Sequence, residues 1–289
     1  MEIKIIMITV DTTERILDVL IATHGDDGLR RVAEMTLPAV SGVKYIVTWQ
    51  TTAGGDIPAE LMRDDVEIHE IPTAGSSNNH NAGIELLRAP YCLFADNDLN
   101  YTTEGLVAVI NSLDSHPGID IATFRHSGEP VYYPDKETDF SEKMPKGYSV
   151  ATYDIAARSK SIQNIRFDPN FGVAAPLAAA EDALFILDCR RAGLKCQFFP
   201  VTIVEHAGLS TGYRPIDNPR IAMAEGAYIR LAYGTTGYLR VPLFAWRAWR
   251  KGRMPLVWGL YYVTRGFFSK YVGIHKAKAR VGGCGKTKP

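Results

Sequence analysis

Apolar runs alternate with amphipathic segments over the first two hundred residues of this 289-residue chain. Continuous apolar runs are typical of strands covered on both faces, and apolar residues three or four apart are typical of helices. The segments that predict strands are 17–23, 43–50, 65–71, 91–96 and 119–125. The segments with helical spacing are 26–37, 82–89, 102–115 and 178–193. This alternation predicts an α/β fold with a mainly parallel, doubly wound sheet flanked by helices.

Segments outside this alternation set the expected domain limits. Residues 127–147 are polar and rich in proline, glycine and charge, which predicts a mobile loop over a site. The N-terminal stretch IKIIMITV competes with 17–23 as the first strand, and 17–23 is preferred because the helix after it is better formed. The expected domains are 1–215, which holds the sheet, 216–281, a basic and aromatic helical extension, and 282–289, a disordered tail.

The charge is distributed unevenly along the chain. Lys plus Arg and Asp plus Glu are each 32, so the formal net charge is zero. From Arg240 to the C-terminus there are 12 Lys or Arg and no Asp or Glu, which leaves 20 basic and 32 acidic residues in 1–239. A block of unopposed positive charge indicates an anionic partner for the tail.

The apolar stretches and the cysteines argue against a membrane span near the C-terminus and against a cysteine-bound zinc site. The longest uncharged apolar stretch near the C-terminus is 254–263, which is shorter than the roughly 20 residues of a membrane span. The four cysteines, Cys92, Cys189, Cys196 and Cys284, form no CxxC pair and no zinc-ligand spacing. Reduced cysteines, together with an N-terminal stretch that lacks a small-residue cleavage site, favour a cytoplasmic location.

Three polar residues follow the buried strand at 91–96. Asp96, Asn97 and Asp98 come at its carboxyl end, which is where ligands bind in open α/β sheets. Two carboxylates one residue apart repel each other unless water or a cation screens them. Carboxylate oxygens suit Mg²⁺ or Mn²⁺, which also bridge to a diphosphate. The pair therefore predicts a metal site, with a solvated turn as the alternative.

Five motifs in order resemble family 2 glycosyltransferases of the GT-A fold. They are VLIATHG (19–25), GSSNNHNAGI (75–84), LFADNDL (93–99), the segment 167–193 with its Glu-Asp pair, and VEHAGLSTG (204–212). The similarity covers roughly residues 15–215. It implies an inverting, non-processive enzyme of bacterial cell-surface polysaccharide synthesis that takes a nucleotide-sugar donor and needs Mn²⁺ or Mg²⁺.

The resemblance also implies roles for individual residues. Asp98, Asp96 and His206 are the expected metal site, and Asp182 is the expected general base, with Glu181 orienting it or the acceptor. The residues expected to bind the donor are Ala22, Thr23, His24, Gln50, His80, Asn81 and Asp96, with His80 and Asn81 in a loop before a helix. The residues themselves leave simpler interpretations open: an acidic pair that stabilises a helix dipole, a structural His at a strand end, and an Asn-rich turn.

The chain departs from the family pattern after the second strand, where it reads VTWQT in place of acidic residues. Trp49 or Gln50 is therefore expected to contact the nucleotide by stacking or hydrogen bonding. The QxxRW motif of processive synthases is missing, which favours transfer of a single sugar to a glycan or a lipid-linked acceptor. A sugar-nucleotide nucleotidyltransferase is an alternative, although ATHGDDGLRR lacks the glycine density of that class.

The tail mixes aromatic and basic residues, which is typical of a segment at a membrane surface. Residues 240–281, which Pro242 and Pro255 divide into short helices, are expected to contact an anionic membrane at the inner face of the cytoplasmic membrane. Helices that pack on the sheet domain with a solvated basic face are the alternative. No nucleic-acid motif is present, so no nucleic-acid partner is expected. A non-catalytic protein with a membrane- or nucleic-acid-binding arm is the remaining alternative for the chain.

Overall fold

The chain divides into two compact units. The computed structural model describes residues 14–128, 131–206, 208 and 216–275. One unit comprises Met1–Arg166 and Asp188–Leu209, and the other comprises Phe167–Leu187 and Ser210–Pro289. Residues 167–187, which the sequence grouped with the sheet, thus group with the C-terminal helices. The competing first strand and the predicted tail at 282–289 lie outside the described residues.

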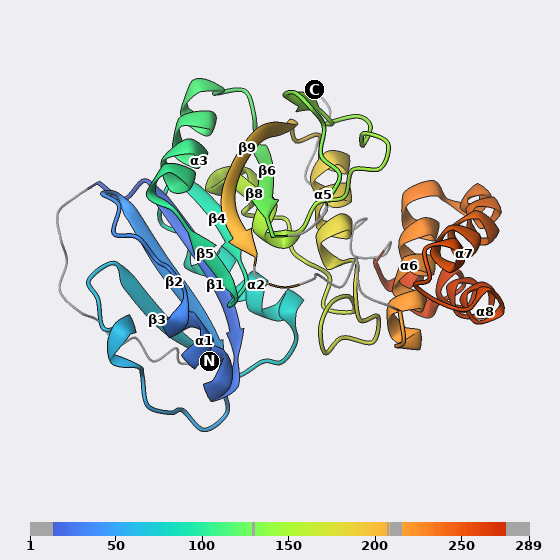
Figure 1. Cartoon of the computed structure of the whole chain (residues 1–289), viewed down its shortest axis with the longest axis horizontal. Coiled ribbons are helices and arrows are strands. Elements are labelled where there is room, and N and C mark those ends of the chain that lie inside the picture. Colours follow the sequence, from blue (N-terminus) through green and yellow to red (C-terminus); the bar gives the residue numbers. More distant parts are fainter. Residues whose placement is uncertain (1–13, 129–130, 207, 209–215, 276–289) are drawn as a thin grey trace, which may run out of the picture. The chain divides into compact units, whose positions relative to one another are not determined.

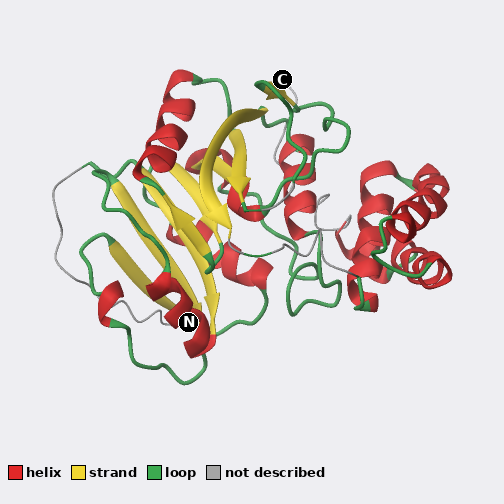
Figure 2. Cartoon of the chain, in the orientation of Figure 1, coloured by secondary structure: helices red, strands yellow, loops and turns green. Residues whose placement is uncertain are grey.

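A nine-stranded sheet forms the first unit (Figures 1 and 2). Its strands are β1 Leu17–His24, β2 Val43–Gln50, β3 Val66–Ile71, β4 Tyr91–Ala95, β5 Leu99–Tyr101, β6 Ile121–Ser127, β7 Thr138–Asp139, β8 Ile155–Arg158 and β9 Cys196–His206. Their order is β3-β2-β1-β4-β8-β6-β9-β5, and β7 pairs with β9. Strands β3, β2, β1 and β4 form a parallel block, and β6 is parallel to β9. Strand β8 runs antiparallel between β4 and β6. The predicted α/β class is confirmed.

Burial explains why the apolar runs located these strands. Every residue of β4 is buried, and in β1 all residues except Ala22 and His24 are buried. A fully buried Val, Leu or Phe side chain contributes about 1.5–3 kcal/mol by leaving water, so these segments gain most from a central position. Strand β3, in which Glu67 and Glu70 are only half-buried, lies at the end of the sheet, as its pattern predicted.

The helices of the first unit match the predicted segments less closely than the strands do. They are α1 Gly25–Glu34, α2 Ser76–Leu86, α3 Thr103–Ser115, the short α4 Ser159–Ile162, and the single turns η1 Ala59–Leu61 and η2 Thr152–Asp154. Helix α2 begins six residues before the predicted start at 82, so the expected loop through His80 and Asn81 is wrong. Its first turns are polar, which hides the helical period, and Gly75, with φ +96°, turns the chain into the helix.

The second unit is helical. Its C-terminal helices are α6 Pro219–Tyr233, η3 Thr235–Leu239, α7 Arg240–Arg250 and α8 Leu256–Phe267. The acidic pair opens α5 Glu181–Arg191, and the division between the units falls within that helix. Residues 167–187 group with these helices because Phe171 and Leu184 share a buried cluster with Ala224 and Leu231 of α6. No helix in the described part of the chain is long and apolar enough to cross a membrane.

Two glycines bring the backbones of α6 and α8 into contact. A Cβ on Gly226 would lie 1.9 Å from the carbonyl oxygen of Val263, and a Cβ on Gly266 would lie 1.9 Å from that of Met223. Real Cβ atoms do not approach backbone oxygens so closely, so neither helix accepts a side chain at this crossing. Small residues at a helix crossing permit this close approach.

We expect Gly226→Ala to lower the free energy of unfolding by about 3 kcal/mol, because an overpacked core costs 1–3 kcal/mol or more and the neighbouring atoms here belong to the backbone. Helix propensity alone would predict the opposite change in stability, because it favours Ala over Gly by about 1 kcal/mol. Urea unfolding followed by far-ultraviolet circular dichroism measures the change. Gly118→Ala is the control, because nothing lies within 4 Å of a Cβ at that position. Equal stability of the two variants would contradict the close packing.

A buried ion pair joins the start of the second unit to its last described residue. His275 Nδ1 lies 2.7 Å from Asp168 Oδ2, and both side chains are buried. Asp168 also accepts hydrogen bonds from the backbone and side-chain nitrogens of Asn170. Burial opposes ionisation of Asp168, but the bonds from His275 and Asn170 outweigh it and lower the pKa of this carboxyl below its ordinary value.

We expect His275→Ala to cost about 3 kcal/mol at neutral pH, because it leaves the buried Asp168 carboxylate without the imidazole that binds it. A lowered carboxyl pKa stabilises the fold above the unfolded-state pKa, and this contribution is lost as the pH falls through the folded-state pKa. The acid-side loss of stability should therefore be shallower in the variant than in the wild type. Urea midpoints measured between neutral pH and pH ~3 test this, with the exposed His24→Ala as control. Parallel pH profiles for wild type and His275→Ala would refute the assignment.

Candidate active site

The carboxyl ends of β1, β2 and β4 meet at one edge of the sheet. These strands are parallel, with His24 opposite Gln50 and Ala95 opposite Ile21. The polar residues after each strand therefore gather at this edge, which is the usual ligand-binding edge of an α/β sheet.

Side-chain amides hold the segments at this edge together. The Thr23 hydroxyl accepts a hydrogen bond from Asn97 Nδ2 at 2.8 Å, and the Thr23 carbonyl accepts one from Asn79 Nδ2 at 2.8 Å. Gln50 Nε2 donates to the Gly75 carbonyl at the start of α2, at 3.0 Å. Asn97, which the sequence left without a role between the two aspartates, thus links the DxD triplet to β1.

Asp98 and His206 lie together, as the resemblance implied for a metal site. Strand β5 pairs antiparallel with β9 and places Leu99 opposite His206. As a result, His206 Nε2 lies 3.5 Å from Asp98 Oδ2. The Asp98 side chain is 46% exposed and that of His206 only 6%, so a ligand can reach the carboxylate while the imidazole stays fixed in the protein.

Three close contacts fix the position of His206. The Tyr153 ring stacks on its imidazole with centroids 5.1 Å apart, and the His126 ring meets it edge-on at 6.4 Å. Gly128, with φ +97°, runs so close that a Cβ would lie 2.0 Å from the His206 carbonyl oxygen. Such contacts orient a ligating imidazole before any ion binds.

A buried polar network lies next to His206, and the sequence did not predict it. His126 Nδ1 lies 2.8 Å from Asp154 Oδ1 and 2.7 Å from the Tyr133 hydroxyl. His126 and Asp154 are both buried. One signal was available in the sequence, because His126 follows an apolar strand as His206 does. Its partners, however, come from an irregular segment and from the single turn η2.

Asp96 lies near His80 rather than at the Asp98–His206 pair. His80 Nε2 is 4.0 Å from Asp96 Oδ1, and the imidazole packs edge-on against Phe94. Burial lowers the pKa of His80 to about 4, so the ring is neutral near pH 7. Asp96 is therefore placed beside a neutral polar group, and its role on the nucleotide side of the site stays a prediction.

The remaining donor-site residues differ in accessibility. Ala22 is half-buried and His24 is exposed, whereas Thr23 and Gln50 are buried and use their side chains within the protein. Asn81 is half-buried on α2. Their contacts with a donor stay predictions.

The structure excludes stacking of a nucleotide base on Trp49. Its side chain is only 1% exposed, and its indole N–H donates to the Gly25 carbonyl at 3.0 Å. A stacking base needs an open ring face, which this tryptophan does not offer.

Glu181 and Asp182 begin α5 within the second unit. Both side chains are half-buried, and Asp182 Oδ1 accepts a hydrogen bond from the backbone of Ala183 at 2.6 Å. The residue before them, Ala180, has φ +69°, a left-handed conformation that costs a non-glycine residue of order 1 kcal/mol. Strain of this kind clusters at functional sites, but it does not by itself assign a role to the pair.

The described residues contain no ready-made metal cage. Within 14–128, 131–206, 208 and 216–275, no three His, Cys, Asp or Glu side chains form a metal-binding group. The Asp98–His206 pair nevertheless fits an ion such as Mg²⁺, which usually takes one or two carboxylates from the protein and its other ligands from water and substrate phosphates. The pair fits a metal that arrives with a phosphate-bearing ligand.

Comparisons with known proteins give the fold. No family model and no curated protein matches the chain. S. aureus TarS 1–349 in complex with UDP matches with TM-score 0.53 at 15% identity, over 81% of this chain and 72% of that chain. Its UDP-GlcNAc complex matches with TM-score 0.52 at 14% identity, over 81% and 73%. The mannosyltransferase PcManGT from Pyrobaculum calidifontis, in complex with GDP-Man and Mn²⁺, has a TM-score of 0.48 at 12% identity, over 96% and 78%.

The fold is therefore that of the GT-A-like glycosyltransferases. The fold class expected from the five motifs is confirmed by the TarS structures, and their low sequence identity establishes the fold and nothing finer.

Proposed function

We propose that this protein is a metal-dependent glycosyltransferase that moves a single sugar from a nucleotide-sugar donor to an acceptor hydroxyl. The observation that carries the proposal is the Asp98–His206 pair, 3.5 Å apart at the carboxyl edge of a GT-A-like sheet. The TarS structures with this fold hold UDP and UDP-GlcNAc, which supports a nucleotide sugar as the donor class.

The edge of the sheet offers groups for each part of such a donor. The backbone N–H groups at the start of α2 suit an anionic phosphate, and Asp96, whose side chain is 42% exposed beside the buried His80, suits the hydroxyl groups of a ribose. Asp98 and His206 would hold Mn²⁺ or Mg²⁺. When bound, that ion would offset the charge of the departing diphosphate.

Asp182 is proposed as the general base, with Glu181 orienting it or the acceptor. The acceptor oxygen forms a bond to the anomeric carbon while the bond from that carbon to the diphosphate breaks. The nucleoside diphosphate leaves with the electron pair, and Asp182 takes the proton of the acceptor hydroxyl. A direct displacement of this kind inverts the anomeric configuration. The acceptor class we propose is a glycan or a lipid-linked saccharide of a cell-surface polysaccharide pathway.

Release of nucleoside diphosphate from UDP-, GDP- and dTDP-sugars tests the donor assignment. We expect at least one donor to be turned over with Mn²⁺ or Mg²⁺ and none in the presence of a chelator. Asp98→Ala and His206→Ala should lower this metal-dependent rate by roughly 100-fold or more, because each removes one of two protein donors to the ion. Asp27→Ala, an exposed carboxylate on α1, should leave the rate unchanged.

Other outcomes of the same screen contradict the proposal. Formation of a nucleoside triphosphate and a sugar 1-phosphate on addition of pyrophosphate would indicate a nucleotidyltransferase. No turnover of any donor, with or without metal, would leave a non-catalytic binding protein.

The Asp182→Asn variant distinguishes a role of Asp182 as general base from a role in binding the donor. We expect transfer to the acceptor to fall by about 10²–10⁴-fold, which is the range for loss of a general base, while UDP binding in the presence of Mn²⁺ stays within about twofold. Isothermal titration measures binding, and product formation measures transfer. Asp27→Asn is the matched carboxylate-to-amide control. Retention of transfer in Asp182→Asn would remove this residue from the mechanism.

A further inference from the structure

Helices α7 and α8 present positive charge that no acidic residue of this part of the chain offsets. From Gly226 to the C-terminus there is no Asp or Glu. The described basic residues from α7 onward are Arg240, Arg247, Arg250, Lys251, Arg253, Arg265 and Lys270. All of these except the half-buried Arg253 are exposed, and they lie on α7, on α8 or in the segments that directly follow these two helices.

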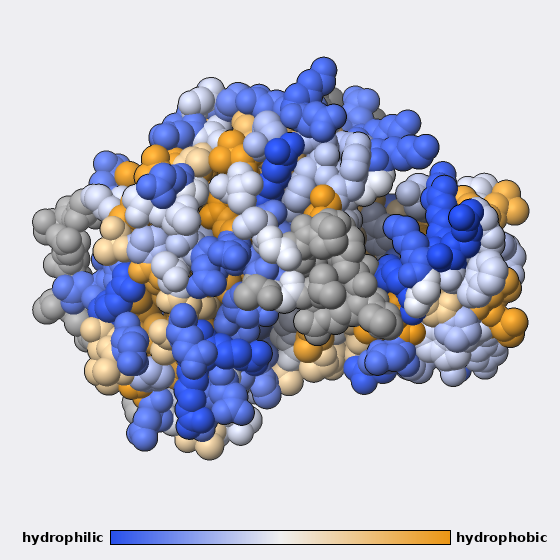
Figure 3. All heavy atoms as spheres, viewed as in Figure 1, coloured by the Kyte–Doolittle hydropathy of each residue, from blue (hydrophilic) through white to orange (hydrophobic). Residues whose placement is uncertain are grey.

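The same helices expose large apolar side chains that the core of the second unit does not use. The residues of α7 and α8 that are buried against α6 include Val241, Ala248, Val263 and Phe267. On the outer side, Val257 is 79% exposed, Phe268 70% and Trp249 50%. Figure 3 shows strongly hydrophobic and strongly hydrophilic residues next to one another over these helices.

Aromatic rings and cations are paired along both helices at a spacing of four residues. The Arg250 guanidinium lies 5.3 Å from the Trp246 ring centre on α7, and that of Arg265 lies 5.8 Å from the Tyr261 ring centre on α8. In each pair the ring is exposed as well as the cation. A ring beside a cation suits the boundary between the headgroups and acyl chains of a lipid layer.

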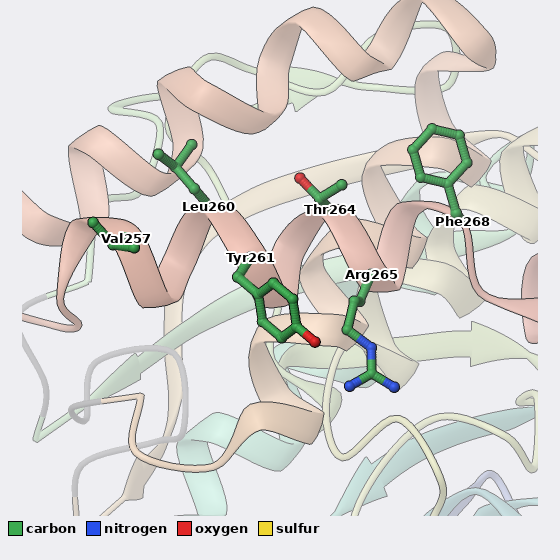
Figure 4. Close-up of a pocket in the computed structure, with 6 residues that line it drawn as sticks. All are labelled: Val257, Leu260, Tyr261, Thr264, Arg265 and Phe268. Carbon is green, nitrogen blue, oxygen red and sulfur yellow. The ribbon is translucent and has the colours of Figure 1, made fainter.

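An open apolar groove of about 580 Å³ runs along the outer side of α8. It is lined by Val257, Leu260, Tyr261, Thr264, Arg265 and Phe268. Figure 4 shows these six side chains spread along the helix, with Tyr261 and Arg265 neighbouring each other. Val257 thus lies at one end of the groove and Phe268 at the other, and the Arg265 guanidinium lies between them.

We propose that the outer face of α7 and α8 binds the surface of an anionic lipid bilayer. Trp246, Trp249, Val257, Tyr261 and Phe268 would enter the headgroup layer, and Arg250, Lys251 and Arg265 would meet lipid phosphates. Charge complementarity selects this occupant: helices with six exposed basic and no acidic side chains between residues 240 and 275 repel a second copy of themselves but attract anionic lipid. In this proposal α7 and α8 lie on the surface of the bilayer. No helix in the described part of the chain is long and apolar enough to cross it.

Flotation of the full-length protein with lipid vesicles tests this surface. We expect binding to vesicles of phosphatidylcholine that contain phosphatidylglycerol, weak binding to pure phosphatidylcholine, and release as salt is raised. Fluorescence of the bound protein should be quenched by brominated lipids, because Trp246 and Trp249 are exposed on this face whereas Trp49 is buried.

Two sets of variants separate charge from apolar contact. A triple Arg250→Gln, Lys251→Gln, Arg265→Gln variant should lose on the order of 100-fold in vesicle affinity, since each basic residue near an anionic surface contributes about fivefold. Val257→Ser with Phe268→Ser should lose bromolipid quenching. The matched controls are Lys136→Gln, Lys143→Gln, Lys146→Gln and Met62→Ser, all exposed residues of the first unit. Residues 276–289 stay intact in every variant, so a loss reports on α7 and α8.

Several results would overturn the proposal. One is the absence of binding to any vesicle, and another is equal loss in the control and test variants. A third is a dimer that forms without lipid, does not depend on salt, and is lost in the Val257→Ser, Phe268→Ser variant. That result would make this face a contact between two copies of the chain. Thermal melting and metal-dependent donor turnover verify that each variant is folded, since none of these residues lies in the candidate active site.

Discussion

The antiparallel pairing of β5 with β9 is the interaction on which the candidate site depends. Strand β5 has three residues, yet it places Leu99 opposite His206 and so brings the Asp98 carboxylate to the imidazole. Without this pairing, the DxD triplet would be a solvated turn after β4, and His206 would end a strand with no ligand beside it. The stacked Tyr153 and the close passage of Gly128 then hold His206 in place, so that the accessible member of the pair is the exposed carboxylate of Asp98.

Burial distinguishes a structural carboxylate from a functional one in this sheet. Asp18, at the amino end of β1, is fully buried, and its carboxylate is bound by Arg15 and by the backbone N–H groups of Arg88 and Ala89. Both of its carboxylate oxygens accept hydrogen bonds within the protein, and its burial keeps a ligand from reaching them. Asp98, at the opposite end of the sheet, is nearly half exposed and lies 3.5 Å from His206. Both aspartates adjoin an apolar run in the sequence. They differ in the end of the strand at which they lie and in the partners that they meet there.

The sequence predicted the parallel strands well, because a strand buried on both faces must be apolar throughout and this pattern survives without any knowledge of its neighbours. It singled out Asp98, His206 and the Glu181–Asp182 pair as candidate site residues through ordered motifs rather than through periodicity. The early start of α2 was missed because Ser76, Ser77 and Asn78 are polar, so no apolar period marks the first turn. Strand β5 and the network of His126 and Asp154 were missed for another reason. Both depend on contacts between segments 28 to more than 100 residues apart, which no local pattern encodes.

The helical unit shows how a small core can leave a face available for another purpose. Gly226 and Gly266 let α6 and α8 approach until their backbones touch, so these short helices pack closely on one side while large residues such as Val257 and Phe268 stay exposed on the other. Exposed Trp, Tyr and Phe side chains cost solubility in water, and unopposed arginines repel one another. Neither feature stabilises the second unit by itself. Both become favourable at an anionic apolar boundary, because the rings leave water there and the cations gain counter-charges, so the same residues that weaken the isolated unit would hold it at a lipid surface.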